Sequence, residues 1–179
     1  MQEIRMSTLK TVQLRYHEAE YFYTQFTIHS GPPYDSYFKM VCYFDAFLSS
    51  LVSIEEMVNE CDQKRLRKID LFRFIKALRN ISVHHCVFAA PQPEAKFERP
   101  FFRHLSDSIG GEQQSSSKLA INYDVLREIF KSIEAERKNE KETLEAAQRY
   151  LSKLESQHQP MYIDLVLHDA LKEVKAFVQ

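Results

Sequence analysis

Apolar residues recur every three or four positions along most of the chain, a spacing typical of amphipathic helices packed against a core. The first repeat consists of Leu9, Val12, Tyr16, Ala19, Tyr23 and Phe26. It predicts a helix that ends before the segment SGPPYD, because Gly31, Pro32 and Pro33 interrupt helical structure.

A second helix is expected to begin near Asp35 or Ser36, since either side chain can cap a helix N-terminus. Its apolar positions form a wide stripe, made of Tyr37, Met40, Val41, Phe44, Phe47, Leu48, Leu51, Ile54 and Val58. A stripe of this width predicts a central helix that is contacted on more than one side.

A third helix is expected from about Lys64 to about Phe88. Its apolar stripe alternates spacings of three and four, through Leu71, Phe74, Leu78, Ile81, His85 and Phe88. This stripe is predicted to point into the core.

Residues 91–120 have a different composition, with three of the six prolines, the Gly110–Gly111 pair and the run Ser115–Ser117. A connection of this length in a compact domain is usually functional or disordered. Its first part alternates basic and aromatic residues, namely Lys96, Phe97, Arg99, Phe101, Phe102 and Arg103. A short hairpin and an ordered flap are both compatible with this pattern.

Helical spacing returns after residue 120, at Leu126, Ile129 and Ile133 and then at Leu144, Ala147, Leu151 and Leu154. The intervening segment EAERKNEKE is polar on every face, so residues 124–158 form either one long helix or two. A final helix carries Ile163, Leu167, Leu171, Val174 and Phe177. We therefore expect one all-α domain over 1–179, an antiparallel bundle of about five helices with 91–120 as a long loop or hairpin insertion.

Composition narrows the functional classes without choosing among them. The chain has 179 residues and a net charge of −1, so binding to nucleic acid or anionic lipid requires a local basic patch. Cys42, Cys61 and Cys86 lack metal-type spacing and are expected to be buried apolar residues in a reducing compartment. The N-terminus has no apolar leader and no uncharged run approaches about 18 residues. We expect a cytoplasmic protein with no membrane segment.

One local patch stands out between residues 63 and 79. This segment contains one acidic residue, Asp70, and seven basic residues. The basic residues are Lys64, Arg65, Arg67, Lys68, Arg73, Lys76 and Arg79. Such a cluster suits contact with a phosphate backbone, although residue types alone favour a solvated helix face.

The segment RNISVH, residues 79–84, carries the candidate chemistry. Asn80 and His84 are four residues apart and share a helix face, whereas His85 continues the apolar stripe and is expected in the core. Arg79 and His84 are separated by about 140° around an ideal helix. They would therefore line opposite sides of a groove or meet groups from a second chain, which favours a site at an interface.

The sequence contains no Gly-rich phosphate loop, nucleophile elbow or zinc-ligand spacing, so no metal or cofactor is expected. Arginine, histidine and an amide suit cleavage of RNA through its own 2′-hydroxyl. Histidine, with a usual pKa of about 6.5, exchanges protons near neutral pH, and arginine stabilises charge on a phosphorane.

Residues Arg79 to His84 resemble the R-x4-H motif of HEPN domains, in which a polar residue often follows the arginine. The chain matches the bare pattern again at RPFFRH, Arg99 to His104, where the proline after Arg99 argues against a helical motif. The resemblance implies a helical domain that dimerises so that two motifs face one cleft. Many such domains are metal-independent endoribonucleases that leave 2′,3′-cyclic phosphates, and serve as toxins or antiviral effectors, often beside a nucleotidyltransferase-like antitoxin.

Under this hypothesis the catalytic residues are Arg79, Asn80 and His84. His84 would activate the 2′-hydroxyl, Arg79 would stabilise the scissile phosphate, and Asn80 would orient one of them. RNA would be guided by Lys64, Arg65, Arg67, Lys68, Arg73 and Lys76, with Lys96, Arg99 and Arg103 as a second contact.

Two other hypotheses belong to different classes. In the first, the chain is a non-catalytic HEPN-like module that binds a protein or nucleotide partner, and Arg79 and Asn80 are structural hydrogen-bonding groups. In the second, the bundle holds a metal or cofactor, for which Glu155 and His158 supply one Glu-x-x-His pair where di-iron bundles need two.

Overall fold

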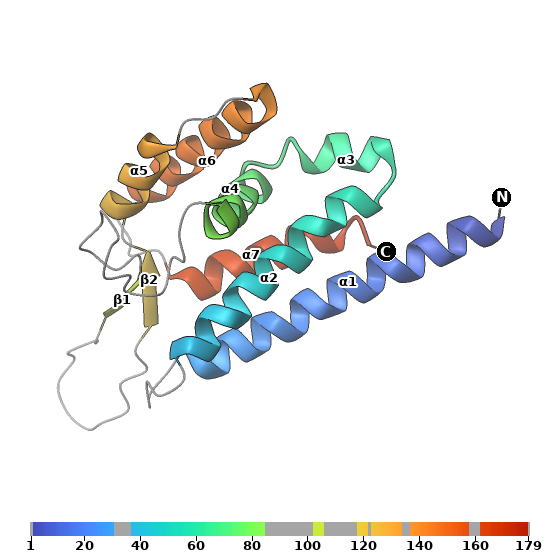
Figure 1. Ribbon diagram of the computed structural model, residues 1–179, viewed down its shortest axis with the longest axis horizontal. Helices are drawn as coiled ribbons and strands as arrows, with labels where there is room; N and C mark the ends of the chain where they lie inside the picture. The colour runs from blue at the N-terminus through green and yellow to red at the C-terminus, as the bar shows by residue number, and fades with distance from the viewer. Residues whose placement is uncertain are drawn as a thin grey trace.

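A computed structural model (Figure 1) describes residues 2–30, 37–84, 102–105, 118–121, 123–133, 137–157 and 162–178. Within these ranges it has seven helices and two short strands. In chain order they are α1 (Gln2–His29), α2 (Tyr37–Met57), α3 (Glu60–Leu66), α4 (Asp70–His84), β1 (Phe102–Leu105), β2 (Lys118–Ile121), α5 (Tyr123–Ser132), α6 (Lys138–Ser156) and α7 (Ile163–Lys175). The predicted all-α bundle is confirmed.

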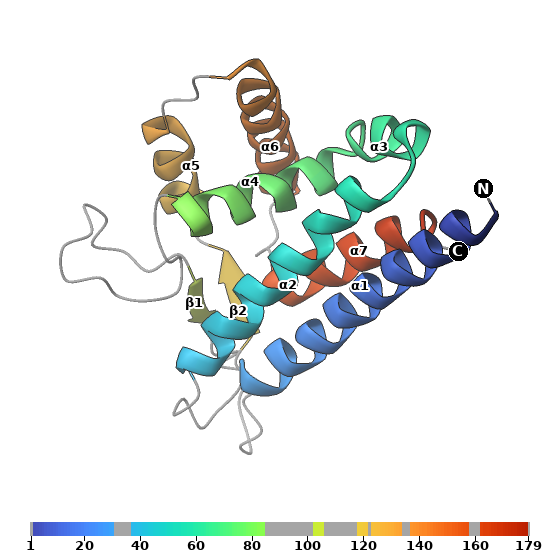
Figure 2. The ribbon, with the colours of Figure 1, turned by 45° about the vertical axis from the view of Figure 1, so that its right-hand side comes forward.

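The helices form two groups with α4 between them. Helices α1 and α2 pack along each other in opposite directions, and α7 lies beside them (Figures 1 and 2). Helices α5 and α6 pack together on the other side, where α6 contacts α4. Helix α4 contacts α2, α6 and α7 and runs from α3 toward the side that carries the β1–β2 hairpin (Figure 2).

The apolar stripes of the sequence meet in this core. On α2, the predicted wide stripe is buried from Met40 to Val58, and α2 contacts α1, α3 and α4, which confirms a central helix. On α4, Leu71, Phe74, Leu78 and Ile81 are all buried. The Phe74 ring meets that of Phe130 edge to face, with centroids 6.3 Å apart, and so joins α4 to α5.

The expected third helix is in fact two helices, and its predicted start at Lys64 is wrong. Helix α3 begins after Asn59, whose Oδ1 accepts a hydrogen bond from the Asp62 N–H at 3.0 Å. It ends at Leu66, and α4 starts at Asp70. No glycine or proline marks this break. At the break, Arg67 donates from Nε to the Glu55 carboxylate of α2. The predicted continuation to Phe88, with His85, lies outside the described residues.

Two open alternatives are decided. The polar segment near residue 137 separates two helices, α5 and α6. In the insertion, β1 and β2 pair antiparallel, with Phe102 opposite Ile121 and Arg103 opposite Ala120, so the hairpin is the form present. The connection between these strands lies outside the described residues.

The prediction of buried cysteines is wrong for Cys42 and Cys61, which are both exposed. Each occupies a position on its helix that faces away from the core, and nothing in the local spacing distinguishes a small apolar side chain on that face. Cys86 lies outside the described residues. In the described part of the chain, no helix combines the length and the apolar character needed to cross a bilayer.

Candidate functional site

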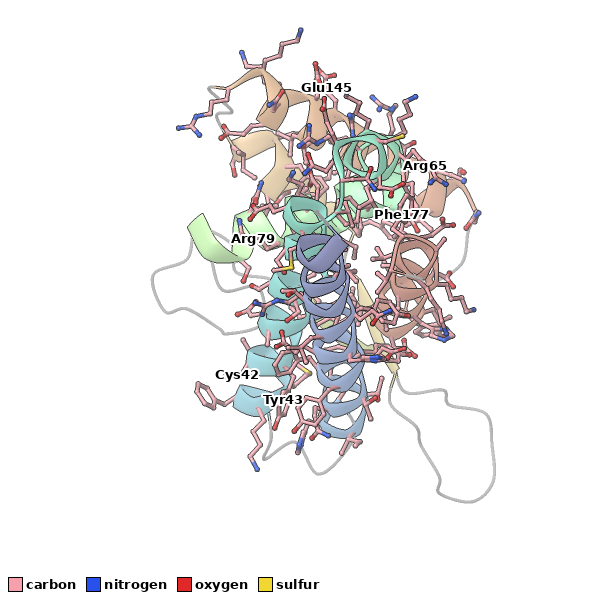
Figure 3. The ribbon with its side chains drawn as sticks, turned by 90° about the vertical axis from the view of Figure 1, so that its right-hand side faces the viewer. Cys42, Tyr43, Arg65, Arg79, Glu145 and Phe177 are labelled. Carbon is pink, nitrogen blue, oxygen red and sulfur yellow. The ribbon has the colours of Figure 1, made fainter. Side chains whose placement is uncertain are left out.

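The end of α4 carries the three residues that the sequence predicts to be catalytic. Arg79 and Asn80 are half-buried one turn before the helix ends at His84. The side chain of His84 is outside the described part, so its backbone alone is placed. Figure 3 shows Arg79 well separated from the Arg65 and Phe177 side chains near the C-terminus of the chain.

Arg79 lies on the side of α4 that faces α2. Lys76 and Ser82 both bond to α2 residues, namely Glu55 and Asp45. At about 100° per residue, Arg79 is about 60° from each of them around the helix and therefore lies between them. We call this line of polar contacts the α2–α4 seam, defined by Asp45, Glu55, Lys76, Arg79 and Ser82.

The guanidinium of Arg79 is only partly satisfied. Its Nη1 donates to Oδ1 of Asn80 at 3.2 Å. Its Nε is buried and has no hydrogen-bond acceptor within the described part of the chain. A buried donor without an acceptor costs about 1–3 kcal/mol, so an acceptor supplied by a ligand would be favoured here.

Asp45, on α2, reaches the middle of the motif. Its Oδ1 accepts a hydrogen bond from the Ser82 hydroxyl, which lies between Arg79 and His84 in the sequence. Burial raises the pKa of the Asp45 carboxyl above its usual range, and the Ser82 hydrogen bond offsets this only in part. Within the described ranges, no cation lies within 4 Å of this carboxylate, so it is a partly desolvated charge without an ionic partner.

Glu55, also on α2, organises the opposite end of the seam. Its side chain is only 3% exposed, and its two oxygens accept from Arg67 Nε and Lys76 Nζ, each at 2.5 Å. Burial alone would raise its pKa, but the hydrogen bonds from Lys76 and Arg67 prevail and lower it. Glu55 therefore fixes both the α3–α4 turn and the face that α4 presents to α2.

The basic cluster is largely balanced by acids that lie outside the 63–79 window. Lys64 pairs with Glu60 at 2.7 Å and Arg65 with Asp62 at 2.8 Å, both on the surface of α3. Exposed pairs of this kind contribute about 0–1 kcal/mol, so a phosphate can displace the acid. Arg67 and Lys76, by contrast, are held by the buried Glu55.

The other predicted RNA contacts are spread over the fold. Lys68 is exposed in the α3–α4 turn, and Arg73 donates from Nη1 to the Glu142 carbonyl of α6 at 3.2 Å. Arg103 lies on β1, with its side chain outside the described part, and Lys96 and Arg99 are entirely outside it. The second R-x4-H match thus ends on a strand at His104, unlike the helical copy.

Sequence reasoning missed Asp45 and Glu55. Both lie on α2, 37 and 21 residues before their α4 partners Ser82 and Lys76. Their only local signal is an acid on a helix that is otherwise strongly apolar, as Asp45 interrupts the run from Tyr43 to Leu48. Burial of such an acid predicts that it has a polar partner, but the sequence does not identify which residue that partner is.

No protein-family model, curated protein sequence or solved structure matches the chain. Within the described ranges, no three His, Cys, Asp or Glu side chains come together as a metal site would require. Glu155, half of the Glu-x-x-His pair, bonds to Arg127 Nη2 at 2.5 Å, and His158 lies outside these ranges.

Proposed function

We propose that this chain is a metal-independent endoribonuclease of the HEPN type. The observation that carries the proposal is Arg79, a half-buried arginine one turn from the end of α4. Its Nε has no acceptor among the described residues, and its Nη1 donates to Asn80. An arginine pre-positioned in this way suits a phosphate group, because the guanidinium fork matches two phosphate oxygens.

The reaction follows from the chemistry of three residues. His84 takes the proton of a 2′-hydroxyl, and the resulting oxygen attacks the neighbouring phosphorus. Arg79 stabilises the charge on the pentacoordinate phosphorane, and Asn80 holds the guanidinium through its Oδ1. The 5′-oxygen leaves with a proton supplied by water, and the product ends in a 2′,3′-cyclic phosphate.

A homodimer brings the two motifs to one cleft. Arg79 faces α2, and His84 lies about 140° further around α4, so one chain does not place both side chains on one face. Two copies related by a twofold axis can combine Arg79 of one with His84 of the other. RNA then reaches the cleft along Lys64, Arg65, Lys68 and Arg73, with Arg103 on the hairpin as a further contact.

The biological setting that we propose is cytoplasmic defence or a toxin–antitoxin pair. An antitoxin of the nucleotidyltransferase-like class is the partner we infer from the motif, and it would restrain the ribonuclease.

The test is cleavage of a structured RNA by the purified chain in excess chelator. We expect cleavage to persist, and to fall about 10²-fold or more in Arg79→Ala and in His84→Ala, because each removes a transition-state contact. Arg149→Ala on α6 and His17→Ala on α1 change exposed residues of the same types and should retain full activity. Cleavage that depends on a metal, or survives His84→Ala, contradicts the mechanism.

A non-catalytic module that binds a partner is the second candidate, and the Arg79–Asn80 contact favours it, since structural arginines form such contacts too. The two candidates separate on stability. A structural Arg79 predicts that Arg79→Ala lowers the melting temperature. An Arg79 that serves to bind substrate, with a buried Nε that no described residue accepts from, predicts little change or a rise.

A further inference from the structure

The carboxylate of Asp45 has capacity to bind something beyond the protein. Its Oδ1 accepts from Ser82, while Oδ2 has no hydrogen-bond partner within the described part of the chain. Asp45 is half-buried and pairs with no cation of the described ranges, in contrast to Glu55 on the same helix, which pairs with two. Because burial raises its pKa, this carboxylate gains from any donor that approaches Oδ2.

Asp45 and Arg79 offer complementary groups at the same seam. Ser82, which Asp45 contacts, is three residues after Arg79, so the two α4 positions are neighbours on the helix surface. As far as the described residues show, Asp45 has an acceptor oxygen without a donor, and the guanidinium of Arg79 has a donor without an acceptor. A ligand that satisfies both carries an anionic acceptor and, a short distance away, a hydroxyl or amine donor.

The two sides of Arg79 are not equivalent. Ser82 and Asp45 lie about 60° from Arg79 around α4, on the side that α2 covers, so in the proposed dimer the partner's His84 reaches the same phosphate from the other side. In an RNA backbone a phosphate bound by Arg79 has one ribose on each side. The ribose whose 2′-hydroxyl attacks belongs next to the partner's His84, and the ribose on the leaving side then faces α2.

We propose that Asp45 accepts a hydrogen bond from the 2′-hydroxyl of the nucleotide that follows the scissile phosphate, and so distinguishes RNA from DNA. The 2′-hydroxyl is the group by which a protein separates these two backbones. This assignment rests on the proposed ribonuclease function. It makes Asp45 a specificity residue, and leaves proton transfer to His84.

The experiment measures binding, so it does not depend on turnover. A fluorescent RNA oligonucleotide and the DNA of the same sequence are titrated into the His84→Ala chain, in which the RNA stays intact. We expect the RNA to bind about tenfold more tightly, the effect of a hydrogen bond to a charged group. Adding Asp45→Ala should bring the ratio of the two dissociation constants close to one.

Three controls isolate the carboxylate. Glu56→Ala removes an exposed acid from α2, and changes both affinities by charge alone with the ratio unchanged. Ser82→Ala removes the hydrogen bond to Asp45 and keeps the carboxylate, so the ratio of the RNA and DNA dissociation constants should be unchanged. Arg79→Lys weakens both complexes equally, because it acts on the phosphate. Thermal unfolding of Asp45→Ala checks that the fold persists. We expect it to persist, because the raised pKa of Asp45 shows that burial disfavours its charged form.

The two proposals fail in distinguishable ways. A ratio that Asp45→Ala leaves unchanged, equal binding of RNA and DNA by the parent chain, or no binding of either overturns the role of Asp45. A ratio that depends on Asp45 in a chain that never cleaves RNA overturns the enzyme and retains the ribose contact. A single 2′-deoxy substitution after the cleaved phosphate should reproduce the loss in affinity.

Discussion

Glu55 illustrates, at the scale of a residue, how a charge is kept in the core of this bundle. Desolvation of a carboxylate opposes folding, and two charge-assisted hydrogen bonds of 2.5 Å offset it. The outcome is a lowered pKa for Glu55, whereas Asp45, with a single neutral donor, has a raised one. Two acids on one helix thus differ in the number of cations that reach them.

Replacing Glu55 with Gln should destabilise the fold by about 1–3 kcal/mol at neutral pH, since it weakens two hydrogen bonds of a buried group. The pKa of Glu55 is lowered from its usual 4.5, so its contribution is present above that pH and is lost as pH falls through the folded value. Urea denaturation from pH 7 to pH 3 should show the difference between wild type and Glu55→Gln shrinking toward acid. Glu56→Gln, an exposed neighbour, is the matched control, and an equal effect there would contradict a special role for Glu55.

At the scale of elements, the apolar spacing predicted helices whose buried residues lie within one segment. It did not predict features that involve residues far apart in the sequence. The stripes of α1, α2, α4 and α7 are each encoded within one helix, and the structure buries most of their described members, with Tyr23 and Phe177 only partly buried. The break between α3 and α4 coincides with a contact between Arg67 and Glu55, 12 residues earlier, and no apolar spacing within the segment predicts it. The candidate site divides in the same way: Arg79 and Asn80 share α4, and Asp45 comes from α2.

The start of α3 did have a local signal in Asn59. Its Oδ1 caps the Asp62 N–H, and its Nδ2 donates to the Asp62 carboxylate at 2.7 Å. Asn59→Ala should therefore cost about 1 kcal/mol of stability, the usual effect of losing an N-cap. The free energy of unfolding in urea measures it. Asn139→Ala, on the exposed first turn of α6, should stay within about 0.5 kcal/mol, and a similar loss at both sites would argue against the cap.

At the scale of the whole molecule, α4 connects the two halves of the bundle to the candidate site. It packs on α2 and α7 along one side and on α6 along the other, so its position is set by the entire core. Its last turn reaches the side that carries the β1–β2 hairpin, where Arg103 lies (Figure 2). A second copy placed against this end would meet both Arg79 and the hairpin.

The proposed sharing of a site between two copies has a direct test in mixed dimers. Arg79→Ala and His84→Ala chains are each expected to be inactive. After mixing and exchange, half of the dimers are mixed, and each has one site that combines an intact Arg79 with an intact His84 from the other copy. Activity should then return to about a quarter of the wild-type value. Recovery should fail with two differently tagged Arg79→Ala chains, and the absence of recovery in a mixture shown to exchange would place each site within one chain.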